Sequence, residues 1–325
     1  MHVSSKCRNV FVVGCPRSGT SWLSNMLGEH HDIIQIPHES WAYKFVYEPF
    51  EYIHKFNFQQ RIRNRKWLIK RYKLSSVLFG IQSNDLWEGI LRDYSNGKND
   101  NTGFPERVKH IGIHNLVSEQ DFRKLVQTVC GLPEKDLVKA RKLVVRLFEQ
   151  CFLNLGGKPN QVLLEKTPEH VRRVNLILSD FPDAKVIEII RDGRDVCASF
   201  QSYAKSQLWA QKSTTEIIQL WQKHIKFGMK FRHDPSISSD RFISVKYEDL
   251  RQNTKAELTR LLDYIGLNSD LDIVDSIVSA HDIRNIKFKG EGKHTNKGIV
   301  GRWRDSLSVD DIALWDHLAH EDLKR

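Results

Sequence analysis

The sequence predicts an α/β fold with three layers, in which helices cover both faces of a central, mostly parallel sheet. Four strand-length apolar runs, rich in β-branched residues, support this prediction: Val10–Val13, Gln161–Glu165, Lys185–Ile190 and Arg241–Lys246. Their apolar residues are continuous, as in strands that are buried on both faces. Helical segments alternate with the strands, which is typical of an α/β domain. The predicted helices are Ser18–Glu29, Glu134–Leu155, Pro168–Ser179, Asp192–Lys205, Thr214–Phe231, Lys255–Ile265 and Val309–Leu323.

One region interrupts this alternation. Between Trp41 and Gly131 the sequence is polar and rich in aromatic residues, with few strand signals and a loop-like stretch at 95–105. We therefore expect residues 1–325 to form a single domain with a helical, basic insertion at about 41–131.

The charge, the apolar runs and the cysteines of the sequence indicate which partners and which compartment to expect. The 325 residues include 50 Lys and Arg against 40 Asp and Glu, a formal net charge of +10. This excess indicates an anionic partner, which could be a nucleic acid, an acidic membrane surface or a small, multiply charged ligand. The sequence has no apolar run long enough to span a membrane and no signal-peptide pattern near its beginning. Its five scattered cysteines predict a cytoplasmic protein without a disulfide framework.

The first strand-to-helix turn carries the strongest local signal. Gly14 and Gly19 have the spacing of a P-loop, and a positive helix end after such a turn is an anion site. Thr20 stands where a nucleotidase needs Lys, although Arg17 offers another cation. The turn therefore predicts phosphate binding in a P-loop-like fold and disfavours ATP hydrolysis. The alternative is a tight turn that uses glycine only for its backbone geometry.

A second turn has the same strand-turn-helix form. Arg191 follows a strand, and Ser199 lies eight residues later, about two helical turns along. Arginine and a hydroxyl group suit a phosphate monoester. The alternative is a surface ion pair of Arg191 or Arg194 with Asp192 or Asp195.

The two turns together resemble motifs of sulfotransferases that use 3′-phosphoadenylyl sulfate (PAPS). The residues that carry the resemblance are PRSGTSW at 16–22 and RDGRDV at 191–196, whose wording is nearest protein-tyrosine sulfotransferases and bacterial homologues. The resemblance implies that Arg17 neutralises the bridging oxygen that leaves, and that Arg191 and Ser199 hold the 3′-phosphate. It also implies that the 5′-phosphosulfate is held by Ser18, Gly19, Thr20 and Ser21. Trp22 would stack on the adenine or serve as a core residue.

Three further segments fit the same family. Lys166, in the string EKTP at 165–168, would stabilise the transferred sulfuryl group; the alternative is a surface lysine. Tyr247 would approach the adenine, or is an ordinary buried tyrosine. Lys297 and Gly298 would belong to a loop over the 3′-phosphate, although Asn296 stands where the family has Arg. The nearby segment that contains Lys287, Lys289 and Lys293 is predicted to be a solvated basic loop that could act as a lid.

The general base is expected just after the first helix and its return segment. By resemblance Glu39 is the preferred base, and His38 is the alternative or a partner of Glu39. A purely structural role, with Glu39 capping a helix near Trp41, competes with both. We expect His30 and His31 to be surface residues at a helix end, and we predict no metal site.

The segment 61–73 holds seven cations with interleaved aromatic residues. It could bind nucleic acid, an acidic glycan or a membrane surface. We favour a solvated amphipathic helix, with Ile62 among its partly buried residues, and expect no nucleic-acid partner.

The sequence therefore predicts a sulfotransferase that moves a sulfuryl group from PAPS to a hydroxyl group of an acceptor and releases adenosine 3′,5′-bisphosphate (PAP). The acceptor could be a carbohydrate, a lipid, a small metabolite or a tyrosyl peptide, and the insertion would shape its site. The alternatives are a P-loop kinase or NTPase, which Thr20 disfavours, and a nucleic-acid-binding protein.

Overall fold

The computed structural model describes residues 8–53, 58–63, 66, 83–95, 113–281 and 298–323. The chain divides into two compact units. The first unit comprises Met1–Ile36 and Lys158–Arg325, and the second comprises Pro37–Gly157. In the described part of the chain, no helix is long and apolar enough to cross a membrane.

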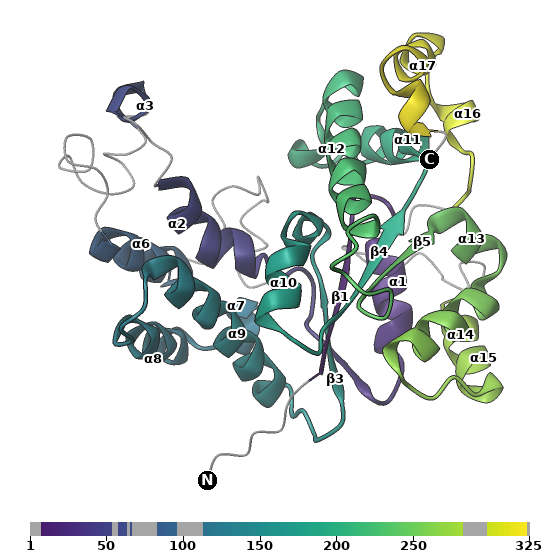
Figure 1. The fold of residues 1–325 in the computed structure, drawn as a ribbon. Coiled ribbons are helices and arrows are strands. Elements are labelled where there is room, and N and C mark those ends of the chain that lie inside the picture. Colours follow the sequence, from purple (N-terminus) through teal and green to yellow (C-terminus); the bar gives the residue numbers. More distant parts are fainter. Residues whose placement is uncertain are drawn as a thin grey trace. The chain divides into compact units, whose positions relative to one another are not determined.

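The first unit is built on a parallel sheet (Figure 1). Its described strands have the order β2-β3-β1-β4-β5, with β1 in the centre. They are β1 (Arg8–Gly14), β2 (Ile33–Gln35), β3 (Val162–Lys166), β4 (Lys185–Ile190) and β5 (Phe242–Lys246). The predicted α/β fold is confirmed. The short edge strand β2 was not predicted, because three residues give no periodic signal.

Both faces of the sheet are covered, which explains the continuous apolar runs. Val10 and Val12 of β1 belong to one hydrophobic core with helices α1 (Thr20–Gly28), α14 (Thr254–Ile265) and α15 (Leu271–Ala280). Phe11 is fully buried and contacts Phe181, with ring centroids 5.5 Å apart. Burying each such side chain contributes about 1.5–3 kcal/mol to the free energy of unfolding.

The second face also buries a charge. Glu188 of β4 is 1% exposed, and its carboxylate accepts a hydrogen bond of 2.6 Å from Ser244. Nε of Arg232 lies 3.3 Å from the same oxygen, at the end of helix α12 (Thr214–Arg232). Gly228 of α12 leaves the room that this carboxylate occupies. Burial raises the pKa of Glu188, and the nearby arginine partly offsets the effect.

The remaining elements of the first unit follow the predicted pattern with a few differences. The predicted helix Pro168–Ser179 is a 3₁₀ helix followed by an α-helix, because its opening residues form the tighter turn. Among the described elements of this unit, three α-helices and the short 3₁₀ helix η4 (Leu208–Ala210) were not predicted; the α-helices are α13 (Tyr247–Gln252), α15 and α16 (Trp303–Ser306). The other elements are η3 (Pro168–Arg173), α10 (Val174–Asp180), α11 (Gly193–Ala204) and α17 (Val309–Leu323).

The described part of the second unit is helical. Tyr94 and Phe122 stack in its core with ring centroids 3.8 Å apart, and the Tyr94 hydroxyl donates to the carbonyl of Val117. The predicted insertion at 41–131 lies within this unit, and helix α9 belongs to it as well. Its elements are η1 (Tyr43–Tyr47), α2 (Glu48–Ile53), α3 (Phe58–Arg63), α6 (Ser83–Ser95), α7 (Ile113–Leu116), α8 (Glu119–Cys130) and α9 (Asp136–Asn154).

Candidate functional site

The candidate site lies at the carboxyl edge of the sheet in the first unit. Strand β1 pairs with β3 on one side and with β4 on the other, and all three run in the same direction. The carboxyl ends of parallel strands meet at one edge, and ligands of open α/β sheets bind where the connections diverge to the two sides. In register, Val12 is opposite Lys166 and Gly14 is opposite Ile189. Lys166 and Arg191 therefore flank the turn that follows β1.

The turn after β1 presents the beginning of helix α1. Ser18 donates from its hydroxyl to the carbonyl of Cys15 at 2.6 Å, which closes the turn. Arg17 has a positive φ of 73°, unusual for a residue with a side chain. Gly19 precedes the helix with a φ of 101°, and no side chain caps the helix here. The first backbone N–H groups of α1 therefore lack a side-chain cap, as in an anion site at a helix N-terminus.

The two predicted anion motifs are in direct contact. Nε of Arg17 donates to Oγ of Ser199 at 3.1 Å, and its guanidinium lies 3.9 Å from the ring centre of Tyr203. One terminal nitrogen of Arg191 donates to the carbonyl of Arg17 at 3.2 Å. Nε of Arg191 is buried and has no hydrogen-bond partner among the described residues, so its donor capacity is unfilled there. The cations of both motifs therefore converge at one place.

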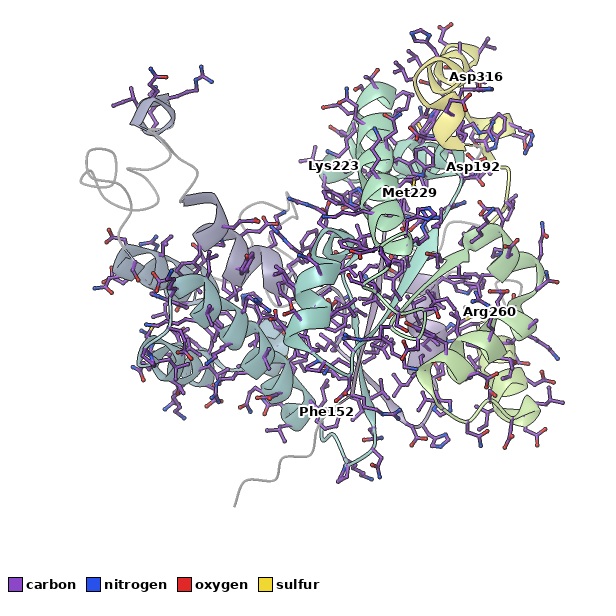
Figure 2. The ribbon with its side chains drawn as sticks, viewed as in Figure 1. Phe152, Asp192, Lys223, Met229, Arg260 and Asp316 are labelled. Atoms are coloured by element: carbon purple, nitrogen blue, oxygen red, sulfur yellow. The ribbon has the colours of Figure 1, made fainter. Side chains whose placement is uncertain are left out.

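The ion pairs that the sequence offered as an alternative are present as well. Asp192, labelled in Figure 2, lies at the beginning of helix α11 and caps it by accepting from the Arg194 backbone. Its carboxylate also pairs with the Arg194 guanidinium at 2.7 Å. Arg191 lies 3.7 Å from Asp195. Asp195 is not a surface residue, however, because it is 1% exposed.

Aromatic residues continue the site beyond Arg191. The Arg191 guanidinium lies 4.3 Å from the ring centre of Tyr247, which is buried and packs edge-on against Trp22. Burial raises the pKa of Tyr247, and Arg191 partly offsets that rise. Trp22 belongs to the hydrophobic core, and the guanidinium of Arg251 lies 5.0 Å from its ring centre. Of the two predicted adenine contacts, Tyr247 therefore lies next to Arg191, and Trp22 packs behind it against Tyr247.

Lys166 ends strand β3 and is 6% exposed, so it is a buried lysine and not the surface lysine of the alternative. A buried carboxylate supports the turn that follows it. Glu165 accepts a hydrogen bond of 2.5 Å from the Thr167 hydroxyl, and its other oxygen lies 3.0 Å from Nδ1 of His170. Sequence reasoning missed Glu165 and His170. The signal was Glu165 in the string EKTP, because a charge inside a buried strand needs partners, and His170 lies only five residues later.

The segment 298–303 lies beside Arg191. Arg191 reaches the carbonyl of Ile299 at 3.5 Å, and Gly298 is buried. Asp195 accepts from the backbone N–H of Gly301 at 2.8 Å and from that of Trp303 at 3.0 Å. The predicted Lys297 lies outside the described residues, as do Asn296, Lys287, Lys289 and Lys293.

The two candidate bases belong to the second unit. His38 is exposed and has a φ of 61°, and Glu39 is half-buried. Helix η1 begins at Tyr43 with Ala42 as its N-cap residue, so Glu39 is not the capping residue of the structural alternative. Of the basic segment 61–73, the structure describes residues 61–63 and 66, where Ile62 is exposed and not partly buried as expected.

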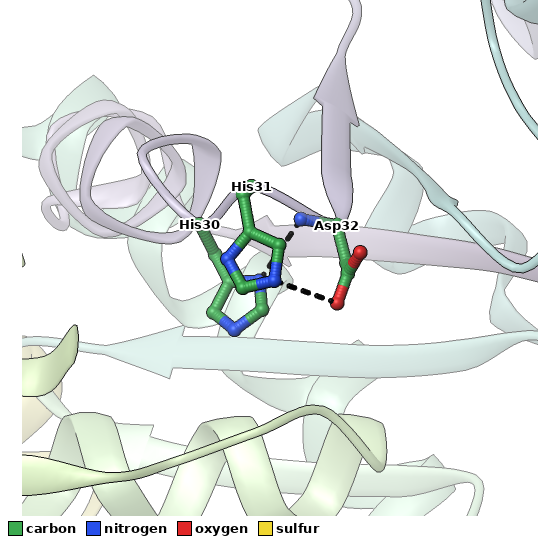
Figure 3. A group of neighbouring side chains, drawn as sticks. All are labelled: His30, His31 and Asp32. Atoms are coloured by element: carbon green, nitrogen blue, oxygen red, sulfur yellow. Dashed lines mark hydrogen bonds and ion pairs between the residues drawn. The ribbon is translucent and has the colours of Figure 1, made fainter.

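Three potential metal ligands lie together in the first unit (Figure 3). The ligand atoms of His30, His31 and Asp32 lie within 4.8 Å of one another. His30 is buried, contrary to the expectation of a surface residue, since Nε2 donates to the carbonyl of Asn268 and Nδ1 accepts from the backbone of Asp32. Both of its ring nitrogens are thus engaged, and the remaining pair is an exposed contact of 3.2 Å between His31 and Asp32. This geometry does not fit a metal site.

Comparisons with known proteins agree with the motifs. A family model described as the sulfotransferase family matches residues 9–270. The chain is 21% identical to an amine sulfotransferase of Oryctolagus cuniculus over 43% of its own length and 55% of that protein. It is 24% identical to sulfotransferase 1A1 of Rattus norvegicus over 47% of its length and 62% of the relative. The matches thus span less than two thirds of each of these relatives.

A solved structure shows the same fold. Mouse sulfotransferase SULT7A1, complexed with PAP, aligns with a TM-score of 0.53 at 12% identity. The alignment covers 98% of this chain and 85% of the mouse protein.

Proposed function

The chain belongs to the sulfotransferase family, and from this premise we propose that it transfers a sulfuryl group from PAPS to a hydroxyl group of an acceptor, releasing PAP. The observation that carries the proposal is the contact between the two anion motifs, from Arg17 to Ser199 and from Arg191 to Arg17. A nucleotide with a 5′-phosphosulfate and a 3′-phosphate needs two cationic centres close together. The unfilled donor of Arg191 and the uncapped beginning of α1 suit such a ligand.

In this proposal, the residues around α1 hold the 5′-phosphosulfate, and Arg191, Ser199 and Gly298 hold the 3′-phosphate, together with Lys297. Trp22 and Tyr247 contact the adenine. The acceptor oxygen forms a bond to sulfur while the bond from sulfur to the bridging oxygen breaks. Arg17 neutralises the charge on that leaving oxygen, and Lys166 neutralises charge on the transferred group. Such a transfer depends mainly on positioning and electrostatics, so the mechanism needs no metal.

The proton of the acceptor hydroxyl is taken by Glu39, with His38 as the alternative base. The acceptor is a carbohydrate, a lipid, a small metabolite or a tyrosyl peptide. Screening these classes for transfer of radiolabelled sulfate from PAPS would identify it. With that acceptor, Glu39→Gln should lower kcat by roughly 10²- to 10⁴-fold and leave the affinity for PAP unchanged. Full turnover of Glu39→Gln together with loss of turnover in His38→Asn would assign the base to His38.

Thermal unfolding with ligands tests the main proposal. A ligand at 100 times its dissociation constant adds about 2.7 kcal/mol to the free energy of unfolding, so PAP should raise Tm by several degrees. ATP with magnesium and duplex DNA are the comparison ligands. A rise with ATP and magnesium but none with PAP would favour a kinase or NTPase, and a rise with DNA alone would favour a nucleic-acid-binding protein.

A further inference from the structure

A buried acidic residue lies directly beside the proposed 3′-phosphate site. Asp195 is on the first turn of helix α11, its side chain is inaccessible to solvent, and one of its oxygens lies 3.7 Å from Arg191. A negative charge at this position opposes the binding of an anion at Arg191. The carboxylate of Asp195 must therefore have a role in this site other than attracting the phosphate.

The hydrogen bonds of Asp195 indicate that role. Its two oxygens accept the backbone N–H groups of Gly301 and Trp303, at 2.8 Å and 3.0 Å. These residues lie more than 100 positions away in the sequence. A carboxylate that accepts two backbone N–H groups is a strong, charge-assisted anchor, and burial strengthens it further.

The anchored segment is in contact with the phosphate-binding arginine. Arg191 reaches the carbonyl of Ile299, two residues before Gly301. Gly301 has a φ of 74°, which a residue with a side chain adopts only at a cost. The Arg194 guanidinium lies 3.9 Å from the ring centre of Trp303, at the other end of the segment. Residues 298–303 are thus held along the beginning of α11, with Asp195 at the centre of the contact.

We propose that Asp195 is a positioning residue for recognition of the 3′-phosphate. Its carboxylate anchors the segment 298–303 and keeps it against Arg191, so that the backbone of the segment and the guanidinium are presented together. This inference rests on the proposed function, because it assigns the 3′-phosphate to Arg191. Asp195 does not touch the reacting atoms.

The affinity of Asp195→Asn for PAP should fall if Asp195 anchors the segment, and it should rise if only the charge of Asp195 matters. Asp195→Asn removes a negative charge, which by itself would strengthen the binding of PAP. The amide oxygen of asparagine accepts hydrogen bonds but its NH₂ group does not, so one backbone contact is lost. If Asp195 anchors the segment, Asp195→Asn should lower the affinity for PAP about tenfold, since a hydrogen bond to a charged group contributes about that factor.

Glu248→Gln is the matched control. Glu248 is another carboxylate near Arg191, and it is partly buried; burial raises its pKa, and the charge of Arg191 partly offsets that rise. It accepts the backbone N–H of Asp192 at 3.0 Å, whereas Asp195 accepts N–H groups of the segment 298–303. This variant removes the same charge near the same arginine, so its affinity for PAP should stay equal or rise. Gly301→Ala is the complementary variant, because it strains the segment without any change of charge.

Calorimetric titration of the full chain with PAP and with adenosine 5′-monophosphate measures the inference. The two ligands differ only in the 3′-phosphate, so general destabilisation of the fold would not change the ratio of their affinities. We expect the ratio to fall about tenfold in Asp195→Asn and to fall in Gly301→Ala, but not in Glu248→Gln. If Asp195→Asn does not fold, the ratio of affinities in Gly301→Ala tests the inference in its place.

The outcomes distinguish the inference from the function on which it rests. A wild-type protein that binds PAP no more tightly than the monophosphate would overturn both. A wild-type protein that prefers PAP, with an unchanged ratio in Asp195→Asn and Gly301→Ala, would overturn the role of Asp195 alone. Equal losses in Asp195→Asn and Glu248→Gln would also overturn it.

Discussion

Replacing Gly19 by alanine tests how closely the first anion turn packs against the aromatic part of the site. A Cβ atom at Gly19 would lie 2.5 Å from Cδ2 and 2.8 Å from Cε2 of Tyr247, distances that require one of the two residues to move. Tyr247 is 4% exposed, with Arg191 over its ring and Trp22 at its edge. The displacement therefore reaches residues from both motifs.

Two costs add in this variant. The positive φ of 101° at Gly19 costs a residue with a side chain about 1–2 kcal/mol. Forcing an extra carbon into a packed site costs a further 1–3 kcal/mol or so. We expect the free energy of unfolding to fall by about 2–5 kcal/mol, which lowers Tm by roughly 5 to 20 °C for a domain of this size.

Gly266→Ala is the control for the first cost alone. Gly266 has a φ of 80° in the same unit, and the atom nearest to an added Cβ is a terminal nitrogen of Arg8 at 3.6 Å. Thermal unfolding of both variants, with PAP titrations in parallel, separates backbone strain from the collision with Tyr247. Our reasoning is refuted if Gly19→Ala costs no more than Gly266→Ala and binds PAP as the wild type does.

Three further predictions concern buried charges. Gly228→Ala places a carbon in the space of the Glu188 carboxylate, so the free energy of unfolding measured in denaturant titrations should fall by about 3–5 kcal/mol. When the same substitution is made in a Glu188→Ala protein, most of this loss should disappear. Because burial raises the pKa of Glu188 above its ordinary 4.5, the stability from this group is full below pH 4.5 and is lost as the pH rises through the folded-state pKa. Stability should thus fall more with rising pH in the wild type than in Glu188→Gln, and equal slopes would contradict the assignment. Glu165→Gln should lower kcat by roughly 10- to 100-fold with little change in affinity for PAP, because Lys166 loses the support of its turn; a loss in affinity alone would argue against this role.

Much of the fold could be predicted because its signals are local. Four strands are continuous apolar runs, and their parallel arrangement follows from the alternation with helices. The strand β2 escaped prediction because its three residues are defined by pairing with β3, opposite Val162 and its neighbours. The helix that begins at Pro168 was predicted as one element, but its first six residues form a 3₁₀ helix in the structure.

In the candidate site too, residues with a local sequence signal could be predicted, and contacts between distant segments could not. Arg17, Arg191 and Ser199 lie in contiguous motifs, so the sequence alone could nominate them as site residues, but it could not predict the contacts between them that the structure shows. Asp195 could only be read as an ion-pair partner, because the N–H groups that it accepts come from a distant segment. His30 looked like a surface residue for the same reason, since the carbonyl that it binds belongs to Asn268.

The placement of charge in the site depends on the register of the sheet as much as on the loops. Lys166 is opposite Val12, whose side chain lies in the core on the face that carries α1. Glu165 is opposite Phe11 and faces the other side, since side chains alternate along a strand. A shift of β3 by one residue would exchange the two, placing a carboxylate where the lysine stands beside the anion turn. The hydrogen bonds of Glu165 to Thr167 and His170 are local to its own segment, so the pairing of β3 with β1 decides which face receives the lysine. The observed pairing leaves Lys166 on the face of α1, where the proposed transfer needs a cation.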